Sequence, residues 1–366
     1  MTHRPVTQAP VGVTGAAGFI ASRIVEQLLA RGYRVRGTVR SLAKLKDLAH
    51  LRALPGAAER LELVEADLLR PETFRAAVAG CERVMHTASP YALDVKDPQK
   101  DLVDPAVQGT RNVLAACKAA GSVKRVVLTS SMAAVTDEPE GDHVLTEKDW
   151  NTRSTLDRNA YYYSKTLAEK EGWRFVDEEK PGFDLVAVNP FLVIGPSLSP
   201  GLNTSNQLFT DLLGGTYPGI MNLTWGFVDV RDVADAHVRA MEAERASGRY
   251  LCAGETIAMR EVVALLTEAG YAEGYKLPKL GLDCAAGDFT VRLSSYLQPK
   301  GVGSYLRTHV GRVPRYDTAK IRGKLGMVFR PAKQSILDTV ADLARWGHLP
   351  ARAGVKEAAV KAAPQG

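Results

Sequence analysis

The residues best suited to chemistry are Tyr161 and Lys165, which lie four positions apart in a predicted helix over 160–179. Residues four apart share one face of a helix, so the phenol and the ammonium can converge on one ligand. An adjacent ammonium and a positively charged nicotinamide both favour phenolate in a tyrosine, whose ordinary pKa is about 10. The pair therefore predicts a proton donor and acceptor beside a hydride transfer. An aromatic stripe is the alternative, because Tyr162 and Tyr163 follow directly.

Two serines, Ser130 and Ser131, end the predicted strand 125–130 and would point into the same crevice. One of them can donate to a substrate carbonyl and stabilise the alkoxide that forms as hydride arrives. We choose Ser131; the alternative is that both are ordinary strand-end hydrogen bonders. Asn112 could support a water-mediated proton path or bond locally within its own helix.

A glycine-rich turn lies about 140 residues before the tyrosine. Gly15 and Gly18 follow the predicted strand 10–14 and open a predicted helix over 19–31. Without Cβ atoms, they let backbone N–H groups and the helix N-terminus approach a pyrophosphate. Each motif alone is a weak signal, but their order and separation predict a nicotinamide oxidoreductase.

The end of the second predicted strand, 34–39, indicates which dinucleotide is used. NAD sites usually carry an acid there for the ribose 2′-OH, whereas a 2′-phosphate needs a positive charge with a planar fork. This chain has Arg40 at that place, so NADP(H) is favoured, with Lys44 or Lys46 as a secondary contact. The alternative is a solvated surface arginine.

Two further strand ends supply candidate cofactor contacts. Asp67 follows the predicted strand 61–65 and could hydrogen-bond the adenine edge or cap the next turn. Thr87, Ala88 and Ser89 follow the predicted strand 83–87 and would pass under the two riboses.

These motifs fall at strand ends because the first half alternates β-branched runs with amphipathic stretches. That rhythm predicts an α/β fold, a doubly wound parallel Rossmann-like sheet with helices on both faces and its ligand beyond the carboxyl ends of the strands. The predicted strands are 10–14, 34–39, 61–65, 83–87, 125–130 and 184–190, and the predicted helices are 19–31, 73–79, 105–120 and 160–179.

After Pro196 the alternation breaks, which predicts a smaller C-terminal substrate lobe. We expect the Rossmann domain over 8–196 with returns from about 226–255, the substrate lobe mainly over 197–350, and a disordered tail over 351–366. Helices are predicted near 205–213, 230–243, 260–269 and 335–346, while 280–313 stays unassigned.

The composition excludes several classes of protein. The 366 residues carry 47 Lys and Arg against 41 Asp and Glu, a modest surplus of +6 that does not imply nucleic acid. Four widely spaced cysteines suggest neither a zinc site nor a disulfide framework, and no apolar run is long enough for a membrane span. We expect a cytoplasmic protein without metal and without membrane or nucleic-acid partners.

The combination of these motifs resembles the extended short-chain dehydrogenase/reductases, most closely the dihydroflavonol reductase and cinnamoyl-CoA reductase branch with its bacterial and yeast aldehyde and ketone reductases. The resemblance has specific motifs from about Pro10 to Ala243, continues loosely to Trp346 and gives nothing for the tail. It is carried by 14–21, 37–40, Asp67, 86–90, 129–131, 161–165 and 189–196.

In that family a serine, a tyrosine and a lysine reduce a carbonyl with NADPH, and the resemblance assigns these roles to Ser131, Tyr161 and Lys165. The cofactor contacts that it implies, together with those deduced above, are Thr14, Gly15, Ala17, Gly18, Phe19, Ile20, Arg40, Lys44, Asp67, Leu68, Thr87, Ala88, Ser89, Tyr161, Lys165, Pro190, Phe191, Val193 and Ser205.

The chain departs from the family in its third glycine, which is Ala21 here, and in its substrate lobe, so flavonoid or CoA-thioester specificity is not inherited. Candidate pocket residues are Ser89, Tyr91, Phe191, Asn206, Phe209 and Trp225, and core packing explains the aromatic ones equally well. The predicted reaction is NADPH-dependent reduction of a small aldehyde or ketone by a monomer or homodimer. The alternatives are an NAD-dependent sugar-nucleotide epimerase or hydroxysteroid dehydrogenase, and a non-catalytic NADP-sensing regulator.

Overall fold

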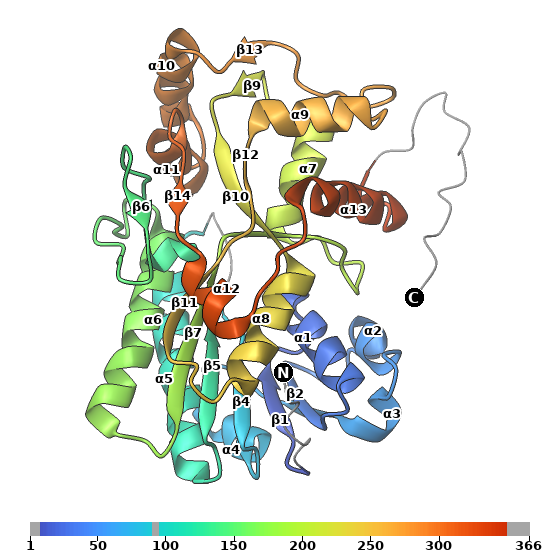
Figure 1. Ribbon diagram of the computed structural model, residues 1–366, viewed down its shortest axis with the longest axis vertical. Coiled ribbons are helices and arrows are strands. Elements are labelled where there is room, and N and C mark those ends of the chain that lie inside the picture. Colours follow the sequence, from blue (N-terminus) through green and yellow to red (C-terminus); the bar gives the residue numbers. More distant parts are fainter. Residues whose placement is uncertain (1–7, 90–94, 350–366) are drawn as a thin grey trace.

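The computed structural model describes residues 8–89 and 95–349. A seven-stranded sheet forms the lower part of the molecule in Figure 1, and a smaller lobe lies above it. The strand order is β11-β7-β5-β4-β1-β2-β3, and every neighbouring pair is parallel. The bounds are β1 Val11–Thr14, β2 Val35–Val39, β3 Leu61–Glu65, β4 Arg83–His86, β5 Arg125–Thr129, β7 Asp184–Pro190 and β11 Gly248–Cys252.

This strand order places the ligand crevice. From β1 the chain proceeds outward through β2 and β3, then returns to β4 on the other side of β1 and continues through β5, β7 and β11. The connections therefore reverse direction between β1 and β4. In a doubly wound sheet the ligand binds beyond the carboxyl ends of the strands at such a point.

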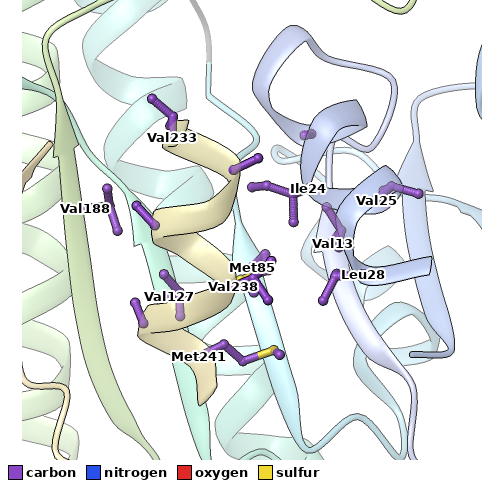
Figure 2. Close-up of a cluster of buried hydrophobic side chains, with 14 of the residues drawn as sticks. Val13, Ile24, Val25, Leu28, Met85, Val127, Val188, Val233, Val238 and Met241 are labelled. Atoms are coloured by element: carbon purple, nitrogen blue, oxygen red, sulfur yellow. The ribbon is translucent and has the colours of Figure 1, made fainter. Parts of the chain in front are cut away.

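Helices cover both faces of the sheet, as a parallel sheet requires. On one face, α1 (Phe19–Ala30) packs against α8 (Val230–Glu242), and both contribute to one buried apolar cluster. Figure 2 shows side chains of this cluster from α1, α8 and the strands between them, with Val13, Ile24, Val25, Leu28, Met85, Val127, Val188, Val233, Val238 and Met241 labelled.

The other face carries α4 (Phe74–Val78), α5 (Asp104–Ala120) and α6 (Ala160–Glu179) over a second apolar cluster. Helix α5 packs along α6, so the helix that carries Tyr161 has a neighbour along its length. Short helices flank the sheet at α2 (Ala49–Arg52), α3 (Ala57–Arg60) and α12 (Ala319–Leu325).

The doubly wound sheet predicted from the sequence is confirmed, and each of the six predicted strands is found within two residues of its expected bounds. The seventh strand, β11, was not predicted as a strand, although it lies within the expected return over 226–255. It comes after the regular alternation has ended, and it is recognisable only because it pairs with β7, where Gly248 lies opposite Val186.

The smaller lobe is built around strands β8 (Leu192–Ile194), β10 (Thr224–Asp229) and β12 (Thr256–Ala258). Helices α7 (Thr204–Gly214), α9 (Met259–Glu268) and α13 (Ala332–Arg345) pack on this sheet with their own apolar cluster. Two small pairs complete it: β9 (Ile220–Met221) with β13 (Gly281–Leu282), and β6 (Val144–Leu145) with β14 (Arg315–Tyr316).

The segment over 280–313, which the sequence left unassigned, is mostly helical. It contains α10 (Ala285–Ser294), a 3-10 turn at Ser295–Leu297 and α11 (Lys300–His309). The buried positions of these elements are mainly small, as with Gly303 and Ser304, whereas Phe289 is 70% and Leu297 89% exposed. Several large apolar residues thus lie on the solvent face while small residues are buried, so apolar periodicity did not reveal these helices.

Within the described residues, no helix combines the length and the apolarity that crossing a bilayer requires. The same residues hold no cluster of three or more His, Cys, Asp or Glu side chains that could bind a metal. All four cysteines are free thiols, and only Cys284 is exposed.

Candidate active site

The turn between β1 and α1 is open to a phosphate. Gly15 has φ of +65°, and a Cβ there would lie 3.1 Å from the Cβ and 3.2 Å from the Cα of Ala88. Gly18 precedes α1 as its N-cap, with no side-chain cap and no acid in the first turn. The N–H groups of the first turn of α1 are therefore left for an anion. Ala17, Phe19 and Ile20 are partly buried and pack against the core, which fixes the helix start.

Thr14 joins the ends of β1 and β4. Its hydroxyl oxygen accepts the N–H groups of Thr87 at 3.1 Å and Ala88 at 3.0 Å, and its own O–H faces Nδ1 of His86 at 3.0 Å. Burial lowers the pKa of His86 to about 3, so its ring is neutral and accepts the Thr14 proton. The hydroxyl of Thr87 donates to the carbonyl of Thr14. Nothing in the pattern around His86 predicted this role.

Arg40, at the end of β2, has a guanidinium that is available to bind a ligand. Its side chain is exposed, and no residue of the described ranges pairs with it. The N–H of Leu42 donates to the carboxylate of Glu65 at 2.6 Å, which holds the loop that follows. Arg36 earlier in β2 differs, because it donates to Glu62 at 2.7 Å and to backbone carbonyls of the α4 region. Arg40, which directly follows β2, is therefore the arginine suited to bind a 2′-phosphate. The exposed Lys44 lies nearby in the chain.

The loop after β3 is held from two directions. One carboxylate oxygen of Asp67 accepts the N–H of Leu69 at 2.9 Å, so this side chain caps its own turn, as the alternative interpretation proposed. Asn112 on α5 donates to the carbonyl of Leu68 at 2.7 Å. Asn112 thus fixes a strand-end loop 44 residues away, and neither of the two roles considered from the sequence describes this bond.

Lys165 is a buried cation. Its ammonium donates to the hydroxyl of Ser89 at 2.8 Å and lies 5.7 Å from the ring centroid of Tyr161, while the residue is only 8% exposed. Burial lowers the pKa of Lys165 to about 8, so it stays largely charged at pH 7. The structure therefore brings together three predicted residues: the half-buried Tyr161 and the buried Lys165, both from α6, and Ser89, which follows β4.

The two serines after β5 have different partners. The hydroxyl of Ser130 donates to the buried carboxylate of Glu169 at 2.5 Å. Ser131 instead accepts the N–H of Ala133 at 3.1 Å, at the start of the 3-10 turn Met132–Ala134 that packs on α6. The Ser131 hydroxyl thus retains its proton to donate to a ligand. These partners distinguish the serines, which the sequence could not do.

Glu169 anchors α6 below these residues. It lies four positions after Lys165, is 1% exposed, and pairs with Arg249 of β11 at 2.6 Å. Asn189 of β7 donates to Glu169 at 2.7 Å and to the carbonyl of Ser131 at 3.2 Å. Sequence reasoning did not single out Glu169, although its four-residue spacing from Lys165 was the available signal.

Two buried amide oxygens, one on β7 and one on α7, have no hydrogen-bond partner among the described residues. One is Oδ1 of Asn189, and the other is Oδ1 of Asn206, a residue 2% exposed whose amide N–H donates to the carbonyl of Gly195 at 3.0 Å. A buried unpaired acceptor requires a donor. A carboxamide N–H₂ such as that of nicotinamide supplies one, so these residues fit a nicotinamide dinucleotide.

The remaining predicted contacts are spread over the lobe boundary. Pro190 ends β7, and Val193 lies in β8 opposite Val228. The ring of Phe191 packs against that of Tyr316 in a tilted arrangement, with centroids 4.5 Å apart. Ser205 is half-buried in the first turn of α7.

Two of the candidate pocket aromatics belong to the lobe core. Phe209 is 0% exposed and stacks on Phe227 with centroids 6.3 Å apart, while Trp225 is 7% exposed and donates to the hydroxyl of Tyr305 at 3.0 Å. Packing therefore accounts for both. Tyr91 lies outside the described residues.

Comparisons with known proteins indicate the family of this chain. A family model described as the NAD dependent epimerase/dehydratase family matches residues 11–253. Cinnamoyl-CoA reductase CAD2 of Medicago truncatula is 41% identical over 341 residues, which cover 91% of this chain and 95% of that protein. Tetraketide alpha-pyrone reductase 1 of Arabidopsis thaliana is 38% identical over 344 residues, 93% of this chain and 96% of that protein.

Solved structures of similar fold also include reductases. Yeast methylglyoxal/isovaleraldehyde reductase Gre2 complexed with NADPH has a TM-score of 0.77 at 31% identity, covering 93% of this chain and all of that one. Vestitone reductase from alfalfa has a TM-score of 0.72 at 30% identity with the same coverage. The chain therefore belongs to the NAD dependent epimerase/dehydratase family and is an oxidoreductase of its extended short-chain dehydrogenase/reductase type.

Proposed function

We propose that this oxidoreductase uses NADPH to reduce an aldehyde or ketone to an alcohol, with Tyr161 as the proton donor. The observation that carries the proposal is the buried ammonium of Lys165. It is bound to Ser89 at the end of β4 and lies 5.7 Å from the Tyr161 ring. Keeping a charged lysine out of water is costly, and a site that stabilises phenolate and binds a ribose hydroxyl gives that charge a use.

NADP(H) is the cofactor. Arg40 stands where an NAD site has an acid, and it is exposed with its guanidinium uncommitted among the described residues. The same arginine argues against an NAD-dependent epimerase or hydroxysteroid dehydrogenase. The open N-terminus of α1 would hold the pyrophosphate, Ser89 and Lys165 would face the nicotinamide ribose, and Asn189 or Asn206 would accept from the carboxamide.

The bound cofactor supplies the hydride, and the chain supplies the proton and the polarisation. Ser131 donates its free O–H to the carbonyl oxygen, which stabilises the charge that grows there. Tyr161 then transfers its phenolic proton to that oxygen. Lys165 stabilises the phenolate that results, because opposite charges at this distance in a dry site attract strongly. Glu169 and Asn189 hold the Ser131 loop in place through the contacts described above.

The substrate is a small carbonyl compound. The related proteins carry names that refer to a CoA ester, a pyrone, and methylglyoxal or isovaleraldehyde, all carbonyl compounds that differ greatly in size. The lobe of this chain, rather than its catalytic residues, therefore selects the substrate. The unpaired cysteines suit a reducing compartment such as the cytoplasm.

The test is Tyr161→Phe, measured by NADPH consumption with a panel of aromatic and aliphatic aldehydes, β-ketoesters and diketones. We expect turnover to fall by at least 10²-fold while NADPH affinity, followed by fluorescence titration, stays within a few-fold. Tyr163→Phe removes a hydroxyl from the same helix turn and serves as the matched control. Nearly normal turnover by Tyr161→Phe would refute the assignment.

A further inference from the structure

The residue that starts the catalytic helix has an unusual backbone. Asn159 is the N-cap of α6, two positions before Tyr161, and its φ of 51° and ψ of 59° are left-handed. Among the described residues, Lys180 at the other end of α6 is the one other non-glycine residue with positive φ. Such a conformation persists only where surrounding contacts hold it.

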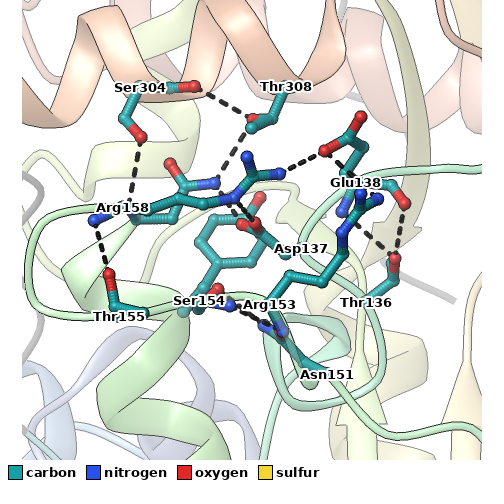
Figure 3. A network of polar contacts seen from close by, with 12 residues as sticks. Thr136, Asp137, Glu138, Asn151, Arg153, Ser154, Thr155, Arg158, Ser304 and Thr308 are labelled. Atoms are coloured by element: carbon teal, nitrogen blue, oxygen red, sulfur yellow. Dashed lines mark hydrogen bonds and ion pairs between the residues drawn. The ribbon is translucent and has the colours of Figure 1, made fainter.

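The contacts that hold Asn159 come from the substrate lobe. Its N–H donates to the hydroxyl of Ser304 at 3.1 Å, and its side-chain amide donates to the hydroxyl of Thr308 at 3.2 Å. Ser304 and Thr308 lie one turn apart on α11. Figure 3 shows both side chains above Asp137 and Arg158. Asn159 is 5% exposed, so water does not replace these bonds.

A buried charge network completes the support. The amide of Asn159 also donates to the carboxylate of Asp137, which is fully buried and pairs with Arg158 at 2.5 Å. Glu138 pairs with Arg158 and with Arg312, which follows α11 in the chain. The loop after β5, the start of α6 and the α11 segment are therefore fastened together at one point (Figure 3).

A second contact from α11 reaches the same helix turn. The ring of His309 lies 5.8 Å from that of Tyr162, and the two are joined by a 3.4 Å contact between Nε2 and the phenolic oxygen. Burial lowers the pKa of His309 to about 4, so this contact carries no charge at pH 7. Helix α11 thus touches the residues on both sides of Ala160 and Tyr161.

We propose that Asn159 is a positioning residue for Tyr161. Helix α11 holds Asn159 through Ser304 and Thr308 and thereby fixes the position of the Tyr161 phenol. The backbone carbonyl of Asn159 accepts the first α6 hydrogen bond, from the N–H of Tyr163 at 3.0 Å. A change in its φ and ψ therefore rotates the first turn and moves the Tyr161 hydroxyl away from the ligand. The inference rests on the proposed function of Tyr161 as proton donor.

The experiment compares Asn159→Gly, Asn159→Ala and Ser304→Ala in the full chain, using NADPH and the best aldehyde found for the wild type. Glycine keeps the left-handed backbone but loses the amide, whereas alanine loses both. We expect kcat to fall about 10-fold in Asn159→Gly and further in Asn159→Ala. KM and NADPH affinity should stay within two-fold. Lys180→Gly is the matched control and should leave kcat unchanged, because it lies at the far end of α6.

Two further measurements make each outcome decisive. Asn159→Gly removes the side-chain bonds to Asp137 and Thr308, and Ser304→Ala removes the acceptor of the Asn159 N–H. The two variants break different contacts that hold Asn159, so the double variant Asn159→Gly/Ser304→Ala should lose more activity than either single variant. Unchanged kcat in Asn159→Gly, or equal losses in kcat and NADPH affinity, would overturn the inference. If Asn159→Ala does not fold, the kcat values of Asn159→Gly and Ser304→Ala decide whether Asn159 positions Tyr161. If Tyr161→Phe stays active the proposed function fails, whereas an inactive Tyr161→Phe beside a normal Asn159→Gly rejects only this inference.

Discussion

Replacing Lys165 with methionine should destroy activity yet stabilise the cofactor-free protein. Methionine has a similar length and no charge, so it suits a residue that is 8% exposed. Lowering the pKa of this lysine from 10.5 to about 8 implies that burial costs its charged form roughly 3 kcal/mol. The variant also loses the hydrogen bond to Ser89, which offsets about 1 kcal/mol of that gain. We therefore expect a net stabilisation of about 2 kcal/mol at pH 7.

The difference in stability between wild type and Lys165→Met should depend on pH. The folded-state pKa of Lys165 lies below its unfolded value, so the cost of the buried charge is fully present below about pH 8 and is relieved between pH 8 and 10.5. Wild-type stability therefore rises, relative to the methionine variant, as pH increases through this window. At pH 9.5 the difference between the two should shrink to less than about 1 kcal/mol.

Urea unfolding of the two cofactor-free proteins at pH 7 and pH 9.5 measures both numbers. Groups that titrate equally in the two proteins cancel in the difference. Lys170→Met, at an exposed position of the same helix, is the control and should show a small change that does not depend on pH. A Lys165→Met protein that is less stable than wild type at pH 7, or a difference that stays constant with pH, would refute the account of a costly buried cation.

Two further substitutions test the neighbouring sites. Arg40→Glu should lower kcat/KM for NADPH by at least 10-fold and narrow or reverse the preference over NADH, because a carboxylate repels the 2′-phosphate; an unchanged cofactor ratio in steady-state assays would contradict this. Ser131→Ala should lower kcat by 10²-fold or more with little effect on melting temperature. Ser130→Ala should instead lower the melting temperature, because it removes the 2.5 Å hydrogen bond to Glu169. The opposite pattern would exchange the roles of the two serines.

The sequence predicted those parts of the site that local spacing defines. The glycine turn is recognisable because a strand, two glycines and a helix follow one another directly. The pairing of Tyr161 with Lys165 follows from a four-residue interval on one helix. The preference for NADP(H) followed from one residue type at one strand end. Each of these arguments needs only neighbours in the chain.

The partners that decide between alternatives come from distant parts of the chain. Ser130 and Ser131 were indistinguishable until Glu169, 39 residues away, was seen to bind only Ser130. Asn112 was given two roles from its helix, and its partner proved to be the carbonyl of Leu68 on another element. The contacts of Asn159 with α11 span 145 and 149 residues, and α11 itself was unrecognisable because its buried face is made of small and polar residues.

The charges around Lys165 bear on the proposed action of this lysine on Tyr161. Arg249 of β11 is another buried cation that contacts α6, and its charge is matched by Glu169 at 2.6 Å. His86, close enough for Lys165 to lower its pKa, is kept neutral by burial. Burial lowers the pKa of Lys165, and no carboxylate of the described residues forms an ion pair with it. If Tyr161 is the proton donor, neutralising Lys165 therefore removes a cation that stabilises its phenolate and leaves intact the paired charges that hold the helix.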